Sequence, residues 1–213
     1  MAKENWIRWS FFIVGLCVLA LGIAMTIEGK RFGIGPWDVF HYGLYTHLGL
    51  TVGTWSIIVG LLILFMYGLV KREIPKIGAW LNMLLLGLFI DFFLWILPEA
   101  TSLFGETLYF IPGVIILGYG IGIYISADLG AGPRDSMMLL FVEKFGWSVK
   151  AVRNGMELTV FLFGWLLGGP IGIGTILIVF FLGSIVNVSL HQSKLVLAKI
   201  LEKENRINAL SYK

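Results

Sequence analysis

Six long apolar stretches occupy most of this chain and restrict it to one kind of fold. They lie near residues 10–27, 53–70, 77–97, 108–127, 155–169 and 171–190. Each has, or nearly has, the roughly 17–25 residues with which a helix crosses about 30 Å of hydrocarbon. A crossing segment must satisfy its own backbone N–H and C=O groups, because lipid offers them no partner, and a helix does this. The fifth stretch is short and runs into Gly168-Gly169-Pro170, so its bounds are the least sharply defined.

The composition agrees with an integral membrane protein. Of the 213 residues, 58% are hydrophobic and 14% are charged, and the mean hydropathy is +0.88. A soluble domain carries about 25% charged residues. The sequence therefore predicts an all-α membrane protein that contacts the lipid bilayer. We expect a single membrane domain over residues 1–213, without a separate soluble domain.

The basic residues predict the orientation of the six crossings. If the N-terminus lies in the cytoplasm, most lysines and arginines between the crossings fall on the cytoplasmic side, and only Lys30 and Arg31 do not. The loop after the third crossing carries Glu99 and Glu106 without a basic residue. The positive-inside rule then places both termini in the cytoplasm. We interpret the net charge of +3 as orientation and lipid contact, and we expect no nucleic-acid partner.

A Gly-Pro-x-Asp segment occurs twice at matching places. The first is Gly35-Pro36-Trp37-Asp38 and the second is Gly132-Pro133-Arg134-Asp135. Proline suits the first position of a helix because its φ angle is fixed near the helical value and it has no N–H to satisfy. The aspartate then falls in the first turn, at the positive end of the helix dipole. One copy alone is typical of a helix cap, whereas two copies indicate an internal repeat.

The repeat extends through most of the chain. Phe11 to Ile27 aligns with Tyr109 to Ile125, and Ile77 to Gly87 aligns with Ile173 to Gly183. The sequence therefore predicts two halves, about 8–98 and 106–191, each with one crossing, a short half-helix and two further crossings. Residues 192–213 form a basic amphipathic tail that we place on the cytoplasmic side. Because three is an odd number of crossings, the second half must be inverted in the membrane relative to the first.

The half-helices are too short to cross the bilayer. Residues 36–48 would form a helix of roughly 18–20 Å. The preceding linker is long enough to return the chain toward the middle of the membrane, so we favour a re-entrant arrangement. A helix that lies flat at the membrane surface is the alternative, and the charges of Lys30 and Arg31 in the linker suit it better.

Two pairs of polar residues at matching positions are the candidate solute-binding residues. Asp38 and Asp135 would converge if both half-helices point their first turns at the centre, and Arg134 would make that site asymmetric. Asp91 and Asn187 occupy equivalent places in the third and sixth crossings, so we expect both to face the interior of the bundle. The alternative for this second pair is structural hydrogen bonding between helices. Gly35, Pro36, Gly132 and Pro133 would set the two helix starts.

Motifs for catalysis or metal binding do not occur. The sequence has no HExxH, paired-cysteine or nucleophile-elbow motif, and its glycine-rich segments lack the Gly-Lys-Ser/Thr of a phosphate loop. We therefore expect no catalytic residues, no metal site, no cofactor and no enzymatic activity.

The two Gly-Pro-x-Asp segments, with the chain length and the crossing pattern, resemble the YczE/YyaS/YitT family of small bacterial integral membrane proteins. The resemblance covers almost the whole chain and is closest to the YczE branch. It implies a multi-pass protein of the bacterial plasma membrane, and it carries over no substrate and no catalytic residues.

Inverted halves with polar residues at symmetric positions favour a small transporter or channel for a cationic or zwitterionic polar solute. The alternative is a membrane scaffold or accessory protein that serves another enzyme or transporter and moves no solute itself. A homodimer or a partner membrane protein is compatible with either function.

Overall fold

The computed structural model describes residues 2–130 and 132–211, with side chains over 4–130 and 132–203. These residues form α-helices and no β-strand, so the expected all-α fold is confirmed. The helices are α1 (Ala2–Glu28), α2 (Pro36–Leu48), α3 (Val52–Lys71), α4 (Ile77–Ile96), α5 (Leu103–Ser126), α6 (Pro133–Phe145), α7 (Val149–Leu166) and α8 (Ile173–Ser211). A short 3-10 helix, η1 (Lys30–Phe32), lies between α1 and α2.

Five of the described helices are long and apolar enough to cross a membrane. They are α1, α3, α4, α5 and α8. The expected fifth crossing corresponds to α7, whose 18 residues include Lys150, Arg153 and Glu157 near its beginning. Because α7 has only 18 residues, these charges leave it without the long apolar run that each of the other five helices contains. The chain is thus a multi-pass membrane protein, and the sixth crossing stays a prediction.

Helices α1 and α5 pack against each other through glycines. A Cβ atom added to Gly15 would overlap the backbone of Tyr124, and one added to Gly22 would overlap the backbone of Leu117. The partner's number falls along α5 as the residue number rises along α1, so the two helices are antiparallel. Small residues at such a contact let two backbones approach closely, which is how helices associate in lipid.

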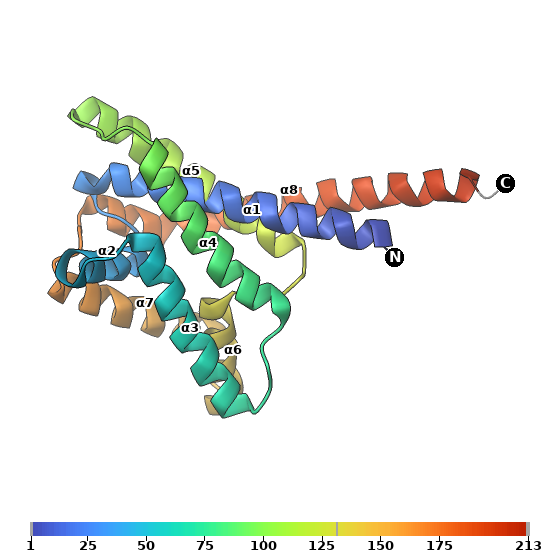
Figure 1. The fold of residues 1–213 in the computed structure, drawn as a ribbon, viewed down its shortest axis with the longest axis horizontal. Helices are drawn as coiled ribbons and strands as arrows, with labels where there is room; N and C mark the ends of the chain where they lie inside the picture. Colours follow the sequence, from blue (N-terminus) through green and yellow to red (C-terminus); the bar gives the residue numbers. More distant parts are fainter. Residues whose placement is uncertain (1, 131, 212–213) are drawn as a thin grey trace.

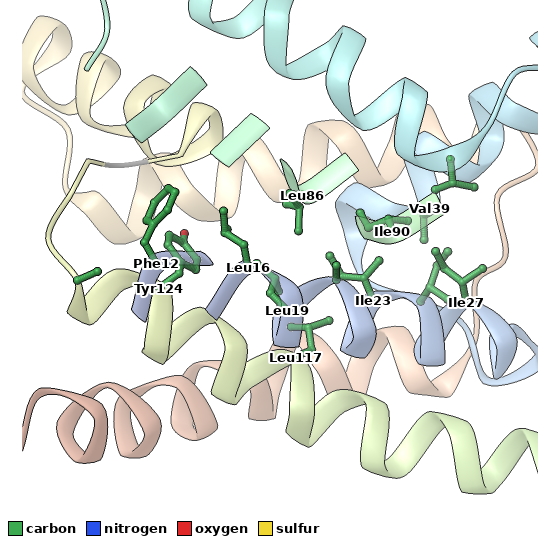
Figure 2. Close-up of a cluster of buried hydrophobic side chains, with 14 residues drawn as sticks. Phe12, Leu16, Leu19, Ile23, Ile27, Val39, Leu86, Ile90, Leu117 and Tyr124 are labelled. Atoms are coloured by element: carbon green, nitrogen blue, oxygen red, sulfur yellow. The ribbon is translucent and has the colours of Figure 1, made fainter. Parts of the chain in front are cut away.

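The largest buried cluster lies where α1 meets α2, α4 and α5 (Figure 2). Its labelled members are Phe12, Leu16, Leu19, Ile23 and Ile27 from α1, Val39 from α2, Leu86 and Ile90 from α4, and Leu117 and Tyr124 from α5. Because lipid is as apolar as these side chains, their close van der Waals packing holds the helices together. α1 is thus the central helix of the bundle.

Helices α1 and α8 lie along the long axis of the molecule, and both termini are marked at the same end (Figure 1). Each short helix packs against a longer one from the other half of the chain, α2 against α7 and α6 against α3. Residues 192–211, which we expected as an amphipathic tail, continue α8 without a break and project beyond the bundle (Figure 1). Tyr212 and Lys213 lie outside the described residues.

Candidate functional site

Both Gly-Pro-x-Asp segments form helix starts. α2 begins at Pro36 and α6 begins at Pro133, each after a glycine in extended conformation, with φ and ψ of −64° and 151° at Gly35 and −63° and 172° at Gly132. Asp38 and Asp135 stand in the first turns. Each helix has 13 residues, a length of about 20 Å that does not cross a bilayer.

The starts of α2 and α6 line one cavity of about 200 Å³. The cavity is also lined by Gly60 of α3 and Leu86 of α4, which lie near the middle of those helices. It therefore lies at mid-depth in the bundle. Three predicted site residues, Asp38, Arg134 and Asp135, are brought together on its wall.

Asp38 and Arg134 face each other across the boundary between the two half-helices. Oδ1 of Asp38 lies 4.0 Å from Nη2 of Arg134. The guanidinium group also lies over the ring of Trp37, 4.7 Å from its centroid, which fixes its position by a cation–π contact. Neither Oδ1 of Asp38 nor Nη2 of Arg134 has a hydrogen-bond partner, although both atoms are buried. The two charges attract one another, but these two facing atoms form no hydrogen bond.

Asp135 lies in a different environment from Asp38. Its Oδ2 accepts a hydrogen bond of 3.1 Å from the hydroxyl of Tyr124, which stands near the end of α5. The matching position in the first half, 98 residues earlier, is Thr26. The two aspartates therefore have the same place in their helices but different partners, arginine for one and tyrosine for the other.

Two further buried polar residues, His41 and Asn82, line the cavity. His41, one turn after Asp38, is buried, and both of its ring nitrogens lack a hydrogen-bond partner. Asn82 of α4 is buried beside the start of α6, where a Cβ atom added to Gly132 would come within 2.8 Å of its Oδ1. Sequence reasoning missed Asn82. The available signal was one amide inside the apolar run from Ile77 to Ile96.

The cavity reaches the beginning of α7. Arg153 and Glu157 both line it and are joined by a hydrogen bond of 3.1 Å from Nε to Oε1, the pairing that their spacing of four residues favours. The side chain of Arg153 is 54% exposed, and that of Glu157 is 26% exposed. This pair therefore forms the outer edge of the cavity, at the end of the molecule where α6 stops and α7 starts.

Asp91 and Asn187 lie outside the cavity. Asp91 accepts hydrogen bonds from the hydroxyl of Thr51, at 2.5 Å, and from the backbone N–H of Gly53, at 2.8 Å. It therefore joins α4 to the beginning of α3, in line with the structural alternative. Asn187 is exposed on α8, so the expectation that it faces the interior is wrong. The reason is that α7 does not cover α8 where α3 covers α4.

Within the described residues, no group of three or more histidine, cysteine, aspartate or glutamate side chains is placed to hold a metal ion. The polar groups on the cavity wall include the ion pair between Asp38 and Arg134, the hydrogen bond between Tyr124 and Asp135, and the buried ring of His41.

Residues 6–191 match the model of a family described as a family of unknown function, DUF6198. The chain belongs to this family. It is 55% identical over 193 residues to the uncharacterised membrane protein YczE of Bacillus subtilis. This alignment covers 91% of this chain and 90% of the relative. It is 30% identical over 182 residues to an uncharacterised protein of Haemophilus influenzae (85% of this chain, 83% of the relative) and 26% identical over 184 residues to YyaS of B. subtilis (85% and 91%). The resemblance to YczE and YyaS is thus confirmed. No solved structure gives a significant match.

Proposed function

We propose that this protein is a small transporter that carries a cationic or zwitterionic polar solute across the bacterial plasma membrane. The observation that carries the proposal is the cavity shared by α2 and α6, on whose wall Asp38, Arg134 and Asp135 meet. A charged side chain at the centre of a bilayer costs about 2.5–3.5 kcal/mol, so such residues are typical of solute and ion pathways. No catalytic reaction is proposed for the site.

The two halves of the chain, α1–α4 and α5–α8, are inverted repeats in this proposal, and α7 is the sixth crossing. Three packing relations support it. The equivalent helices α1 and α5 are antiparallel, the contact of α2 with α7 corresponds to that of α6 with α3, and the contact of α1 with α4 corresponds to that of α5 with α8. Transporters built from inverted repeats bind solute near the midplane, at the ends of broken helices. The half-helices are then re-entrant, with their first turns at the centre.

The two matching seams between the halves are packed unequally. In the α2–α7 seam, a Cβ atom added to Gly43 would come within 2.7 Å of Leu167, and one added to Gly164 would come within 2.5 Å of the backbone of Phe40. In α6 the residue that corresponds to Gly43 is Leu140, and α6 packs less extensively against α3 than α2 does against α7. With both termini in the cytoplasm, the cavity edge at Arg153 faces the cytoplasm. The structure then corresponds to an inward-facing state. If the α6–α3 seam became the tight one and the α2–α7 seam the loose one, the cavity would open to the outside of the cell.

A flux assay tests this function. Purified protein is reconstituted in vesicles and offered labelled amino acids, amines and lipid head-group compounds. We expect uptake of at least one of them by the wild type, and loss of that uptake in Asp38→Asn and in Asp135→Asn. If no compound moves faster than through protein-free vesicles, the transporter proposal fails.

The alternative function is that of an accessory protein, and one observation favours it. The outer face of α8 is uncovered: Asn187 is exposed, and no atom lies within 4 Å of a Cβ atom added to Gly183. A lone amide and a glycine on a lipid-facing helix are suited to contact another helix, from a second copy or from a partner membrane protein. This function predicts a stable complex in mild detergent that Asn187→Leu disrupts and Asp38→Asn leaves intact.

A further inference from the structure

The cavity presents two opposite charges, and each has one buried hydrogen-bonding atom without a partner. Charge-assisted hydrogen bonds between nitrogen and oxygen are about 2.7–2.9 Å long. The 4.0 Å between Oδ1 of Asp38 and Nη2 of Arg134 is too long for one. Both atoms are buried and unpartnered. A buried charge without hydrogen bonds is costly, so each of these atoms calls for a further partner.

We propose that the cavity binds a small zwitterion whose carboxylate accepts hydrogen bonds from Arg134 and whose ammonium group donates to Asp38. This inference rests on the proposed function and narrows its solute class. A guanidinium group binds a carboxylate through two parallel N–H donors, and an ammonium group offers three donors to a carboxylate. The ring of Trp37 contacts the flat face of the Arg134 guanidinium, so the N–H groups at the edge of the guanidinium stay available to the solute.

The charges of the wall disfavour solutes that carry one charge. A plain anion would meet Arg134 but also the carboxylates of Asp38 and Asp135. A plain cation would be attracted by Asp38 but would leave Nη2 of Arg134 unpartnered and close to a like charge. Arg153 and Glu157 are already paired with each other at the edge of the cavity. A solute that carries both a positive and a negative group satisfies both Asp38 and Arg134.

The volume of the cavity limits the solute to a small molecule. A water molecule occupies about 30 Å³ in the liquid, so about 200 Å³ corresponds to six or seven waters. A zwitterion of about that many non-hydrogen atoms, such as glycine, alanine or serine, is of the right size.

Three probes of equal size and shape test the inference. L-alanine carries both charges, L-alaninamide carries only the positive one, and isobutyrate carries only the negative one. Binding of each to the purified protein in detergent is measured by titration calorimetry, with glycine, β-alanine and L-serine as further zwitterions. We expect at least one zwitterion to bind, and its singly charged analogues to bind at least tenfold more weakly. The inference is overturned if no zwitterion binds, or if alaninamide or isobutyrate binds as well as alanine.

Variants give a second arm. Arg134→Gln should lower the affinity for the zwitterion at least tenfold and should leave binding of the amide analogue unchanged or stronger. Arg31→Gln, at an exposed arginine that does not line the cavity, is the matched control and should keep wild-type affinity. Equal loss in both variants would overturn the assignment of the carboxylate to Arg134. Binding of a zwitterion without flux in vesicles would refute the transporter and leave this site intact. Flux of alaninamide but not of alanine would do the reverse.

Discussion

The ion pair between Asp38 and Arg134 gives a sharp test of the site. Breaking a buried pair by removal of one partner costs about 3–5 kcal/mol, because the other charge is stranded. The side chain of Asp38 is 6% exposed and that of Arg134 is 34% exposed, so the two removals should be unequal. Arg134→Gln, which strands the buried carboxylate, should lower the free energy of unfolding by about 2–3 kcal/mol, and Asp38→Asn by about 1–2 kcal/mol. The double variant strands neither charge and should lose only about 2 kcal/mol, which gives a coupling of about 2 kcal/mol.

The assay is denaturant unfolding of the four proteins in the same detergent, followed by tryptophan fluorescence and circular dichroism. Lys71 and Glu143, an ion pair at the surface of the α3–α6 seam, supply the control cycle. Its coupling should stay below about 1 kcal/mol, because exposed pairs are weak. Additive losses at Asp38 and Arg134, with a coupling no larger than in the control, would refute the interaction across the two half-helices.

Further predictions concern the packing. Gly22→Leu should destabilise the protein by about 1–3 kcal/mol or more, because its side chain would meet the backbone of Leu117. At Gly155 nothing lies within 4 Å of an added Cβ atom, so Gly155→Ala should be neutral or stabilising by up to about 1 kcal/mol. Denaturant unfolding curves of the two variants measure the difference, and an equal change in stability would contradict the α1–α5 contact. Asp91→Ala should cost about 1–3 kcal/mol through its lost hydrogen bonds to Thr51 and Gly53, yet leave solute binding at wild-type affinity in calorimetry. Gly43→Leu should widen the α2–α7 seam and make Val39 accessible to thiol reagents when replaced by cysteine. Unchanged protection of that position would count against the tight seam.

Much of the fold could be predicted from hydrophobicity and from proline. The apolar runs set the long helices, and Pro36 and Pro133 set the starts of the short ones, since proline fixes φ and has no N–H. The charged residues of α7 can also be seen in the sequence, but the packing of this helix cannot be predicted from them. Arg153 and Glu157 line the cavity, and α7 packs against α2 and α6 rather than against α8. The matching helix α3 carries no such pair and packs against α4.

The candidate site could be predicted only where the repeat marked it. Asp38 and Asp135 are matched by position, and both line the cavity. Tyr124 corresponds to Thr26, which does not line the cavity, and Asn82 corresponds to Ile178, so the repeat marked neither residue as part of the site. The same symmetry was misleading for Asn187. The equivalent residue in the first half, Asp91, is covered by α3, whereas α8 has no such neighbouring helix. Matching positions in a repeat share backbone geometry, whereas their surroundings depend on how the two halves pack.

The depth of the two half-helix starts in the bilayer tests the central claim most directly. Spin labels are placed, one at a time in a Cys17→Ser background, at Trp37 and Arg134 near the starts and at Leu48 and Phe145 at the ends. Their depth is then measured by electron paramagnetic resonance with oxygen and a water-soluble relaxant. We expect the two starts to lie near the bilayer centre and the two ends to lie at opposite surfaces. Starts at head-group depth would show that the half-helices lie flat on the membrane and share no central cavity.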